Sequence, residues 1–501
     1  MRSFASTLVT ILLTIAAWEL LRWAAWRTLR ERWQRSIGDW MRKHDVRLEQ
    51  FRFVDRLWVR QTLLQDPALD GAAAESAAAS GETIGVVRAR MEQWLDEIVP
   101  VFNVFSYYKV GGAVATAAVR LCYELVFDHR GLERARKAVP TGAVTVYVAN
   151  HRSNADYIVL SVGAMRQVAL SYAVGEWARV WPLDSLFRSF GSYLIRRGER
   201  DPLYHRVLSR YLQLVAGRGL TTAFFLEGAL SRDGAFRVPK IGLLDYLVGI
   251  LHDDPGREIV FIPVGLNFDR VLEDRSLTAE APDAPPPRRR EKLLSLWRIL
   301  RSLPRMLLGL FGPRWLAAHR RFGYAAVSFG KTLPIRTLLP DADAVARLPR
   351  KERHTRIAYL ADQLMAEVAR VVPATPVPLV CRALSAGERE HSALLRWVRE
   401  DIAARRAEGG PVAQGRAFAA IHASRADDEG DDRDAERISR EILDAEEAER
   451  TVDLGLELLR KRGVVRRRGS RFEVDEASAA LVTYYALSLE APRHFAATRG
   501  P

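Results

Sequence analysis

The stretch VTVYVANHRSNADYIVL, residues 144–160, decides how this chain arranges its chemistry. Its first six residues are apolar or β-branched and predict a buried strand. Four residues separate His151 from Asp156, and two helical residues at that spacing would diverge by about 140° around the helix axis. Ser153 and Asp156 resemble a capping box that begins a helix at Asn154. The pattern therefore predicts a strand end, a loop histidine and a first-turn carboxylate, the geometry of a general base with its orienting partner.

Further buried strands are predicted along the chain. They are LTTAFFLE, EIVFIPVGL and YAAVSFG, at residues 220–227, 258–266 and 324–330. Because these runs alternate with helical stretches from about residue 88 to residue 339, we predict an α/β domain in which helices flank the sheet. Adjacent strand ends of such a sheet line one crevice.

Three segments carry polar residues at predicted strand ends. They are GSYLIRRGERD (191–201), FLEGALSRDGAFRVPKIGLL (225–244) and IVFIPVGLNFD (259–269). We expect one strand to end at Glu227 and another at Pro263. The candidate site residues in these segments are Arg196, Glu227, Gly228, Ser231, Arg232, Lys240 and Pro263. A base, several cationic side chains and a glycine turn at one sheet edge suit attack by a hydroxyl on an activated carbonyl while arginine holds a phosphate.

The composition of the chain excludes several classes of protein and several kinds of cysteine-based site. The chain has 501 residues, a formal net charge of +14 and 48% hydrophobic residues, which excludes a disordered tail and a polytopic membrane protein. Its two cysteines, Cys122 and Cys381, exclude a disulfide framework, a Cys-based zinc site and a CxxC redox pair. Arginine carries almost all of the positive charge, because only eight of the 75 basic residues are lysines. Nucleic acid, anionic lipid and a phosphorylated small substrate all remain open as partners.

The N-terminal region holds the only long apolar run, residues 4–21, which is marginal for a membrane-spanning helix. Five arginines follow it within residues 22–35 and one precedes it, so a spanning helix would leave the rest of the chain in the cytoplasm. Trp26, Trp33 and Trp40 share one helical face. That face suits the membrane interface, or equally a contact with the rest of the protein.

We expect four regions along the chain. Residues 1–70 form hydrophobic or amphipathic helices, 71–87 a linker rich in Ala and Ser, 88–339 the α/β domain, and 340–501 a mainly helical domain. Within the α/β domain, residues 280–316 form a Pro/Arg-rich insertion and an amphipathic segment. A late pattern, VVRRRGSRFEV, could be a winged-helix hairpin, but arginine is spread along the whole chain and no recognition helix stands out. We therefore do not expect nucleic acid as a partner.

The motif segments, in this order and spacing, resemble the four motif blocks of the glycerolipid acyltransferases. That family shares a His-x4-Asp pair, a Gly-x-x-x-Ile-Arg-Arg block, a Phe-x-Glu-Gly block and an Ile-Pro block. HRSNADY is similar to the glycerol-3-phosphate and dihydroxyacetone-phosphate branch, and the likeness covers roughly residues 90–495. It implies a membrane-associated enzyme, facing the cytoplasm at a bacterial inner membrane. The enzyme would transfer an acyl group from acyl-CoA or acyl carrier protein to glycerol 3-phosphate, with no metal or other cofactor.

The resemblance also implies a role for each candidate residue. His151 is the general base and Asp156 its orienter. Arg196 helps to bind the phosphate, Glu227 and Gly228 shape the glycerol-phosphate site, Ser231 and Arg232 support that site, and Pro263 shapes the acyl-donor side.

The sequence also departs from the family pattern. Leu230 stands where the family has the first arginine of Glu-Gly-x-Arg-Ser-Arg, a loss that Arg232, Arg237 or Lys240 could compensate. Asn150, where this branch commonly has serine, resembles the lysophosphatidate branch. Dihydroxyacetone phosphate or a lysophospholipid therefore remain alternative acceptors, and a catalytically silent membrane scaffold is a further alternative.

Overall fold

The structure, a computed structural model, describes residues 56–100, 112–164, 167–168, 170–175, 191–196, 198–279, 322–413 and 433–490. The apolar run at 4–21, the tryptophan face that follows it, and the insertion and amphipathic segment at 280–316 lie outside these ranges. Within the ranges, no helix is both long enough and apolar enough to cross a bilayer.

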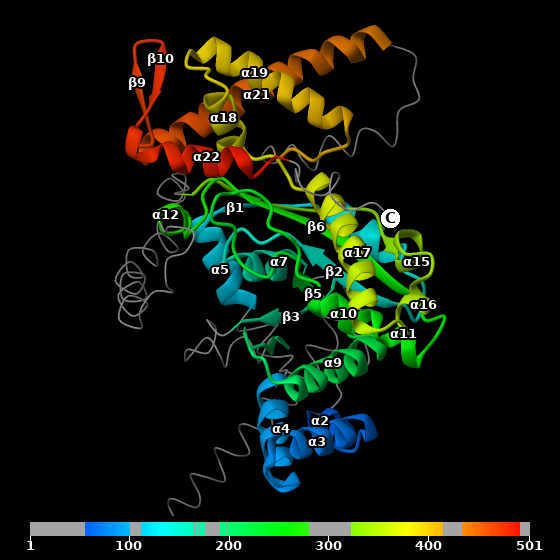
Figure 1. Cartoon of the computed structure of the whole chain (residues 1–501). Coiled ribbons are helices and arrows are strands. Elements are labelled where there is room, and N and C mark those ends of the chain that lie inside the picture. The colour runs from blue at the N-terminus through cyan, green and yellow to red at the C-terminus, as the bar shows by residue number, and fades with distance from the viewer. Residues whose placement is uncertain are drawn as a thin grey trace, which may run out of the picture.

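An eight-stranded sheet forms the centre of the molecule (Figure 1). Its strand order is β1-β7-β6-β2-β5-β3-β4, and β8 pairs with β6. The strands are β1 (Glu124–Phe127), β2 (Val144–Ala149), β3 (Ser171–Val174), β4 (Tyr193–Leu194), β5 (Thr222–Phe225), β6 (Ile259–Phe268), β7 (Tyr324–Phe329) and β8 (Leu333–Pro334). Neighbouring strands are parallel except where β6 meets β7 and β8. The predicted α/β fold with helices around a sheet is therefore confirmed, and the structure shows in addition that the sheet is mostly parallel.

Helices cover both faces of the sheet, and the alternation of β2 shows why. Val144, Val146 and Val148 point into one core, whereas Tyr147 and Ala149 point into the other. The first core is closed by α9 (Pro202–Gly217), α10 (Gly242–Val248), α11 (Ile250–Asp253), α15 (Ile335–Leu338), α16 (Ala342–Val345) and α17 (Arg350–Arg370). The second is closed by α5 (Gly112–Cys122), α6 (His129–Lys137), α7 (Asp156–Ala164) and α12 (Asp274–Ala279).

The N-terminal helices extend the first core. They are α2 (Arg56–Leu64), α3 (Pro67–Ser80) and α4 (Ile84–Ile98). The prediction of a linker at 71–87 is wrong, because α3 occupies most of that range. Alanine is the strongest helix former, the Asp66 side chain accepts a hydrogen bond from the Ala68 backbone N–H, and Gly81 ends the helix with φ of 72°.

The described part of the chain after residue 370, residues 371–413 and 433–490, is mainly helical and contains one hairpin. It consists of α18 (Pro376–Ser385), α19 (His391–Ala407), α21 (Arg433–Lys461), β9 (Val465–Arg468), β10 (Arg471–Val474), the 3₁₀ turn η4 (Glu476–Ser478) and α22 (Ala479–Leu487). Figure 1 shows these elements stacked beyond one end of the sheet, opposite to α2, α3 and α4. Buried residues of α18, α21 and α22 belong to the second core, which joins this region to the sheet.

Candidate active site

The imidazole of His151 is bonded to the carboxylate of Asp156. Nδ1 of His151 lies 2.8 Å from Oδ2 of Asp156, and the two side chains are 2% and 0% exposed. An ionised carboxylate only accepts hydrogen bonds, so Nδ1 carries the proton and Nε2 is left with a lone pair. Among the described residues Nε2 has no hydrogen-bond partner. The pair therefore has the arrangement of a general base and its orienting carboxylate.

The loop between the two residues folds around the same carboxylate oxygen. Oδ2 of Asp156 also accepts the backbone N–H groups of Arg152 and Ser153, at 2.7 and 3.1 Å. The Ser153 hydroxyl accepts the N–H of Ala155 at 3.1 Å, one residue earlier than in a capping box, so only the carboxylate half of the predicted capping box is present. The helix itself begins at Asp156 rather than at Asn154, because residues 154 and 155 form a turn.

Two aromatic rings hold the imidazole. Phe225, the last residue of β5, stacks on it with ring centroids 4.2 Å apart and planes at 15°. Tyr157 meets it edge-on at 5.6 Å and 86°. Both rings belong to the second core. The ring of His151 is therefore fixed by packing as well as by its hydrogen bond.

Glu227 is tied to the histidine backbone. Its carboxylate is fully buried and accepts the N–H of His151 at 2.9 Å and that of Arg237 at 3.0 Å. Burial raises the pKa of Glu227, while the charge of Arg152 and these hydrogen bonds oppose the rise. The strand β5 ends two residues earlier, at Phe225, so Glu227 lies in the turn and fastens it to the end of β2.

Gly228 continues that turn with φ of 66°, a left-handed conformation that a side chain would strain. A Cβ at this position would come within 2.8 Å of Cγ of Lys240. Lys240 is exposed and forms no ion pair within the described residues. Its stem therefore crosses the turn that contains Glu227.

Residues 230–237 form a compact loop beside this turn. The buried hydroxyl of Ser231 donates to the carbonyl oxygen of Ala235 at 2.7 Å and accepts the N–H of Gly234 at 3.0 Å, so it shapes the loop from inside. Arg232 is half-buried. Leu230, in the position of the family's arginine, packs against the second core, and Arg237 donates to its carbonyl oxygen at 3.1 Å.

Arg152 is a buried cation that sequence reasoning did not include among the site residues. It is 1% exposed, and it donates to the carbonyl oxygens of Gly234 and of Ser488, the latter at 3.1 Å. Its guanidinium lies 4.7 Å from the ring centroid of Phe236. Arg152 thus joins the histidine loop to the 230–237 loop and to the end of α22. The signal in the sequence was its place directly after His151.

Glu273 is a second residue that sequence reasoning missed. It accepts the Ser153 hydroxyl at 2.8 Å, and the backbone and side-chain N–H groups of Asn154 at 3.3 and 3.1 Å. Burial raises the pKa of Glu273, and the negative charge of Asp156 raises it further. Asn150 anchors the same loop from the other end, since its amide exchanges two hydrogen bonds with the backbone of Leu266 in β6, at 2.9 and 2.8 Å.

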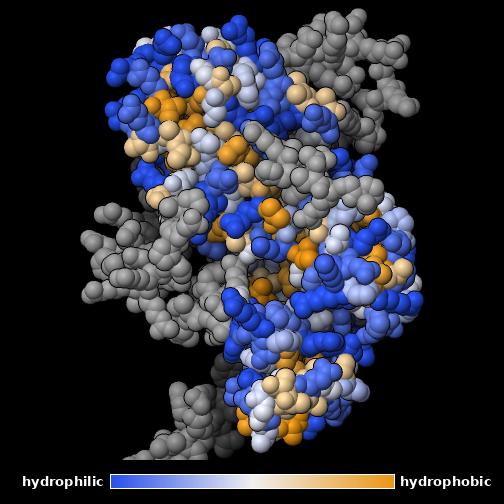
Figure 2. All heavy atoms as spheres, in the orientation of Figure 1, coloured by the Kyte–Doolittle hydropathy of each residue, from blue (hydrophilic) through white to orange (hydrophobic). Residues whose placement is uncertain are grey.

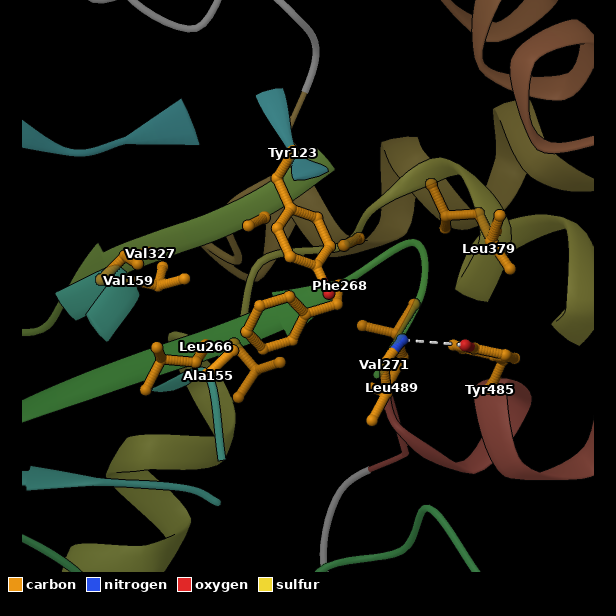
Figure 3. Packing of buried hydrophobic residues seen from close by; sticks show 14 of the residues in the cluster. Tyr123, Ala155, Val159, Leu266, Phe268, Val271, Val327, Leu379, Tyr485 and Leu489 are labelled. Carbon is orange, nitrogen blue, oxygen red and sulfur yellow. Dashed lines mark hydrogen bonds between the residues drawn. The ribbon is translucent and has the colours of Figure 1, made fainter. Parts of the chain in front are cut away.

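The helix α22 contacts residues 271–274, the segment that contains Glu273. The hydroxyl of Tyr485 accepts the N–H of Val271 at 3.0 Å, and it also donates to Asp274, which Arg462 contacts at 2.6 Å. Figure 3 shows Tyr485 reaching toward Val271, next to Phe268 of β6. Residues 271–274 are therefore held by the C-terminal region on one side and hold the histidine loop on the other.

Arg196 does not lie in this cluster. It follows β4, three strands away from β2 and therefore about 14 Å across the sheet. Its guanidinium forms a two-pronged ion pair with Glu97 of α4, at 3.0 and 2.7 Å. The hydrogen bonds and the negative charge of Glu97 raise the pKa of Arg196 above its usual value.

Pro263 does not end its strand, so that prediction is wrong. β6 continues to Phe268. Proline lacks a backbone N–H, and here it stands where β6 changes partner, because Phe261 pairs with β8 and Val264 pairs with β7. Residues of its parity in β6, such as Phe261, point into the first core. The structure therefore places Pro263 on the face of the sheet opposite to the imidazole of His151.

No group of three or more His, Cys, Asp and Glu side chains within the described ranges is arranged to hold a metal ion.

Three comparisons with known proteins found matches. Residues 129–267, which contain His151, Asp156 and Glu227, match the family model described as Acyltransferase. A glycerol-3-phosphate acyltransferase of Aeromonas hydrophila is 27% identical over 336 residues, which cover 65% of this chain and 39% of that relative. The chain thus spans about two fifths of the length of the curated relative it matches.

Among solved structures, the 1-acyl-sn-glycerophosphate acyltransferase PlsC of Thermotoga maritima matches 51% of this chain and 78% of its own at 15% identity. The TM-score of that match is 0.28.

Proposed function

We propose that the chain acylates glycerol 3-phosphate, because residues 129–267 match an acyltransferase family model and the sequence is similar to that of a glycerol-3-phosphate acyltransferase. The acyl group would come from a thioester, acyl-CoA or acyl carrier protein, and would be joined to the sn-1 hydroxyl to give lysophosphatidate. The observation that supports this most is the bond of 2.8 Å between Nδ1 of His151 and Asp156, which leaves Nε2 as a base.

In the proposed reaction, Nε2 of His151 removes the proton of the acceptor hydroxyl as its oxygen attacks the thioester carbonyl carbon. The C–S bond then breaks, and the departing sulfur takes the proton back from the imidazolium. The product ester and a free thiol account for all atoms. Asp156 stabilises the imidazolium between these two steps, so neither a metal nor a covalent acyl-enzyme is needed.

The acceptor phosphate requires cations near His151. Lys240 is the best placed, because it is exposed and its stem crosses the turn of Glu227 and Gly228. Arg232 lies on the neighbouring loop, residues 230–237. Arg196 would have to break its ion pair with Glu97 to reach a phosphate beside His151. Our assignment of Arg196 to phosphate binding therefore rests on the motif. We assign Pro263 to the acyl-donor side on the same basis.

The decisive experiment is to incubate the purified full chain with labelled glycerol 3-phosphate and palmitoyl-CoA and to measure lysophosphatidate. Parallel reactions with dihydroxyacetone phosphate and with lysophosphatidate test the alternative acceptors. The variant His151→Ala is the control, since a general base contributes about 10²–10⁴ in rate. A loss of less than about tenfold would exclude His151 as the base, and no activity with any acceptor would favour a silent scaffold.

We also propose that the protein associates with the cytoplasmic face of a bacterial inner membrane through its first 50 residues. Their tryptophans and arginines suit an anionic lipid surface. The full chain should then bind anionic vesicles in a salt-sensitive manner. Equal binding by a chain that lacks these residues would contradict the proposal.

A further inference from the structure

A second candidate site lies in the C-terminal region. A hollow of about 440 Å³ lies between the first residue of α19, the last turns of α21 and the hairpin β9–β10. Figure 1 shows that this hairpin lies at the side of the C-terminal helices away from the sheet, and the surface over it is largely hydrophilic in Figure 2. The hollow is therefore separate from the site of His151.

Some of the basic side chains around the hollow form ion pairs with carboxylates and others do not. Of the seven Arg and Lys side chains between residues 460 and 471, five form ion pairs with carboxylates. These pairs are Lys461–Glu457, Arg462–Asp274, Arg466–Asp475, Arg468–Glu473 and Arg471–Glu390. Within the described part of the chain, Arg460 and Arg467 have no such partner. Both of these arginines line the hollow.

The two acidic residues of the hollow contact other side chains and not these arginines. Asp453 accepts a hydrogen bond from Nε2 of His391 at 2.9 Å, and Glu457 pairs with Lys461 at 2.5 Å. Arg467 uses only its Nε, which donates to the carbonyl oxygen of Gly469 at 2.9 Å. The terminal nitrogens of its guanidinium are therefore left to bind a ligand.

The hollow also has a defined shape and a further donor. Phe472 is 4% exposed and forms part of its wall, with its ring centroid 6.0 Å from the guanidinium carbon of Arg467. Ser470, which carries a hydroxyl, is a residue of the same lining. Two guanidinium forks and a hydroxyl around a concave surface match the three oxygens of a phosphate group. The volume lies within the range of small-molecule sites.

We propose that Arg460 and Arg467 form a second anion-binding site, separate from His151, that takes a phosphomonoester group. The group belongs either to a soluble metabolite or to a lipid headgroup, since both present the same oxygens. The proposal does not depend on the catalytic function, because none of the residues from which it is argued belongs to the site of His151.

Inorganic phosphate is the first probe, titrated calorimetrically into the full chain at constant ionic strength. The double variant Arg460→Gln/Arg467→Gln should raise the Kd for phosphate at least about tenfold, because each lost charge-assisted contact is worth about that factor. The matched control, Arg466→Gln/Arg468→Gln, removes the same charge from the same hairpin but from arginines that already have carboxylate partners. It should change the Kd by less than about twofold. All four side chains are exposed, so thermal unfolding should show both variants folded.

Absence of phosphate binding by the unmodified chain, or an equal loss in both double variants, would overturn the proposal. The His151→Ala variant should bind phosphate like the unmodified chain, and a loss there would place the anion at the catalytic site instead. Vesicles of phosphatidylcholine with and without phosphatidate distinguish the two sources. If only the Arg460/Arg467 double variant loses its preference for phosphatidate, the ligand is a headgroup. If phosphate binding alone is affected, the ligand is soluble.

Discussion

Replacing Asp156 by asparagine tests the proposed chemistry most directly. The carboxylate oxygen Oδ2 accepts three hydrogen bonds, from Nδ1 of His151 and from the N–H groups of Arg152 and Ser153. An amide oxygen in the same place can accept all three, so the geometry of the loop is retained while the charge is lost. Each bond loses its charge assistance, about 1 kcal/mol, so the free energy of unfolding should fall by about 3 kcal/mol.

The catalytic loss should be larger and should appear in kcat. With 2.8 Å between the bonded atoms, the charge centres of an imidazolium and the carboxylate lie about 4 Å apart. Their attraction is about 4 kcal/mol at an effective dielectric constant of about 20, which corresponds to about 10³ in rate. The KM for glycerol 3-phosphate should change little, because Asp156 contacts the base and not the proposed acceptor.

The assay is steady-state acylation of labelled glycerol 3-phosphate with palmitoyl-CoA, with kcat and KM determined separately and folding checked by thermal unfolding. Glu273→Gln is the matched control, since Glu273 is a half-buried carboxylate that holds the same loop without contacting the imidazole. We expect the control to lose less than about tenfold in kcat. A folded Asp156→Asn variant that retains more than a tenth of the kcat, or that loses activity only through KM, would refute the assignment.

Three further predictions address the phosphate site, the C-terminal brace and the dependence of stability on pH. Arg196→Ala should raise the KM for glycerol 3-phosphate, and an unchanged KM would restrict Arg196 to its ion pair with α4. Gly234→Ala should destabilise the fold more than Gly228→Ala does, because its Cβ would collide with a backbone carbonyl of α22 whereas the Cβ at 228 meets only a flexible lysine stem; comparing the two urea midpoints checks this. Burial raises the pKa of Asp269 from 3.8 to about 7, so the native state holds this proton more tightly than the unfolded chain. Its contribution to stability is complete below pH about 4 and is lost as the pH rises through about 7, by at most about 4 kcal/mol. Urea unfolding from pH 4.5 to 8 should therefore show the unmodified chain losing stability relative to Asp269→Asn, and parallel pH profiles would contradict this.

Local patterns in the sequence were enough to predict the part of the site that lies between residues 144 and 160. The alternation of residues 144–149 places β2 with the bounds predicted. The spacing of His151 and Asp156 separates a loop base from a first-turn carboxylate, because helical periodicity and capping act over only a few residues. At residues 71–80 the high helix propensity of the alanines already indicated a helix. The prediction of a linker gave this propensity too little weight, and the structure shows α3 there.

The residues that complete the site from distant parts of the chain became apparent only from the folded packing. Glu273 lies 120 positions from Ser153, and the carbonyl oxygen of Ser488 lies 336 positions from Arg152. No local pattern marks such partners, because the requirement that a buried polar group be bonded is met by whichever segment the packing brings close. The same packing placed Pro263 on the opposite face of the sheet and turned Arg196 toward Glu97. Neither placement can be read from a motif, since a motif fixes the order of residues along the chain and not the side of the sheet to which they point.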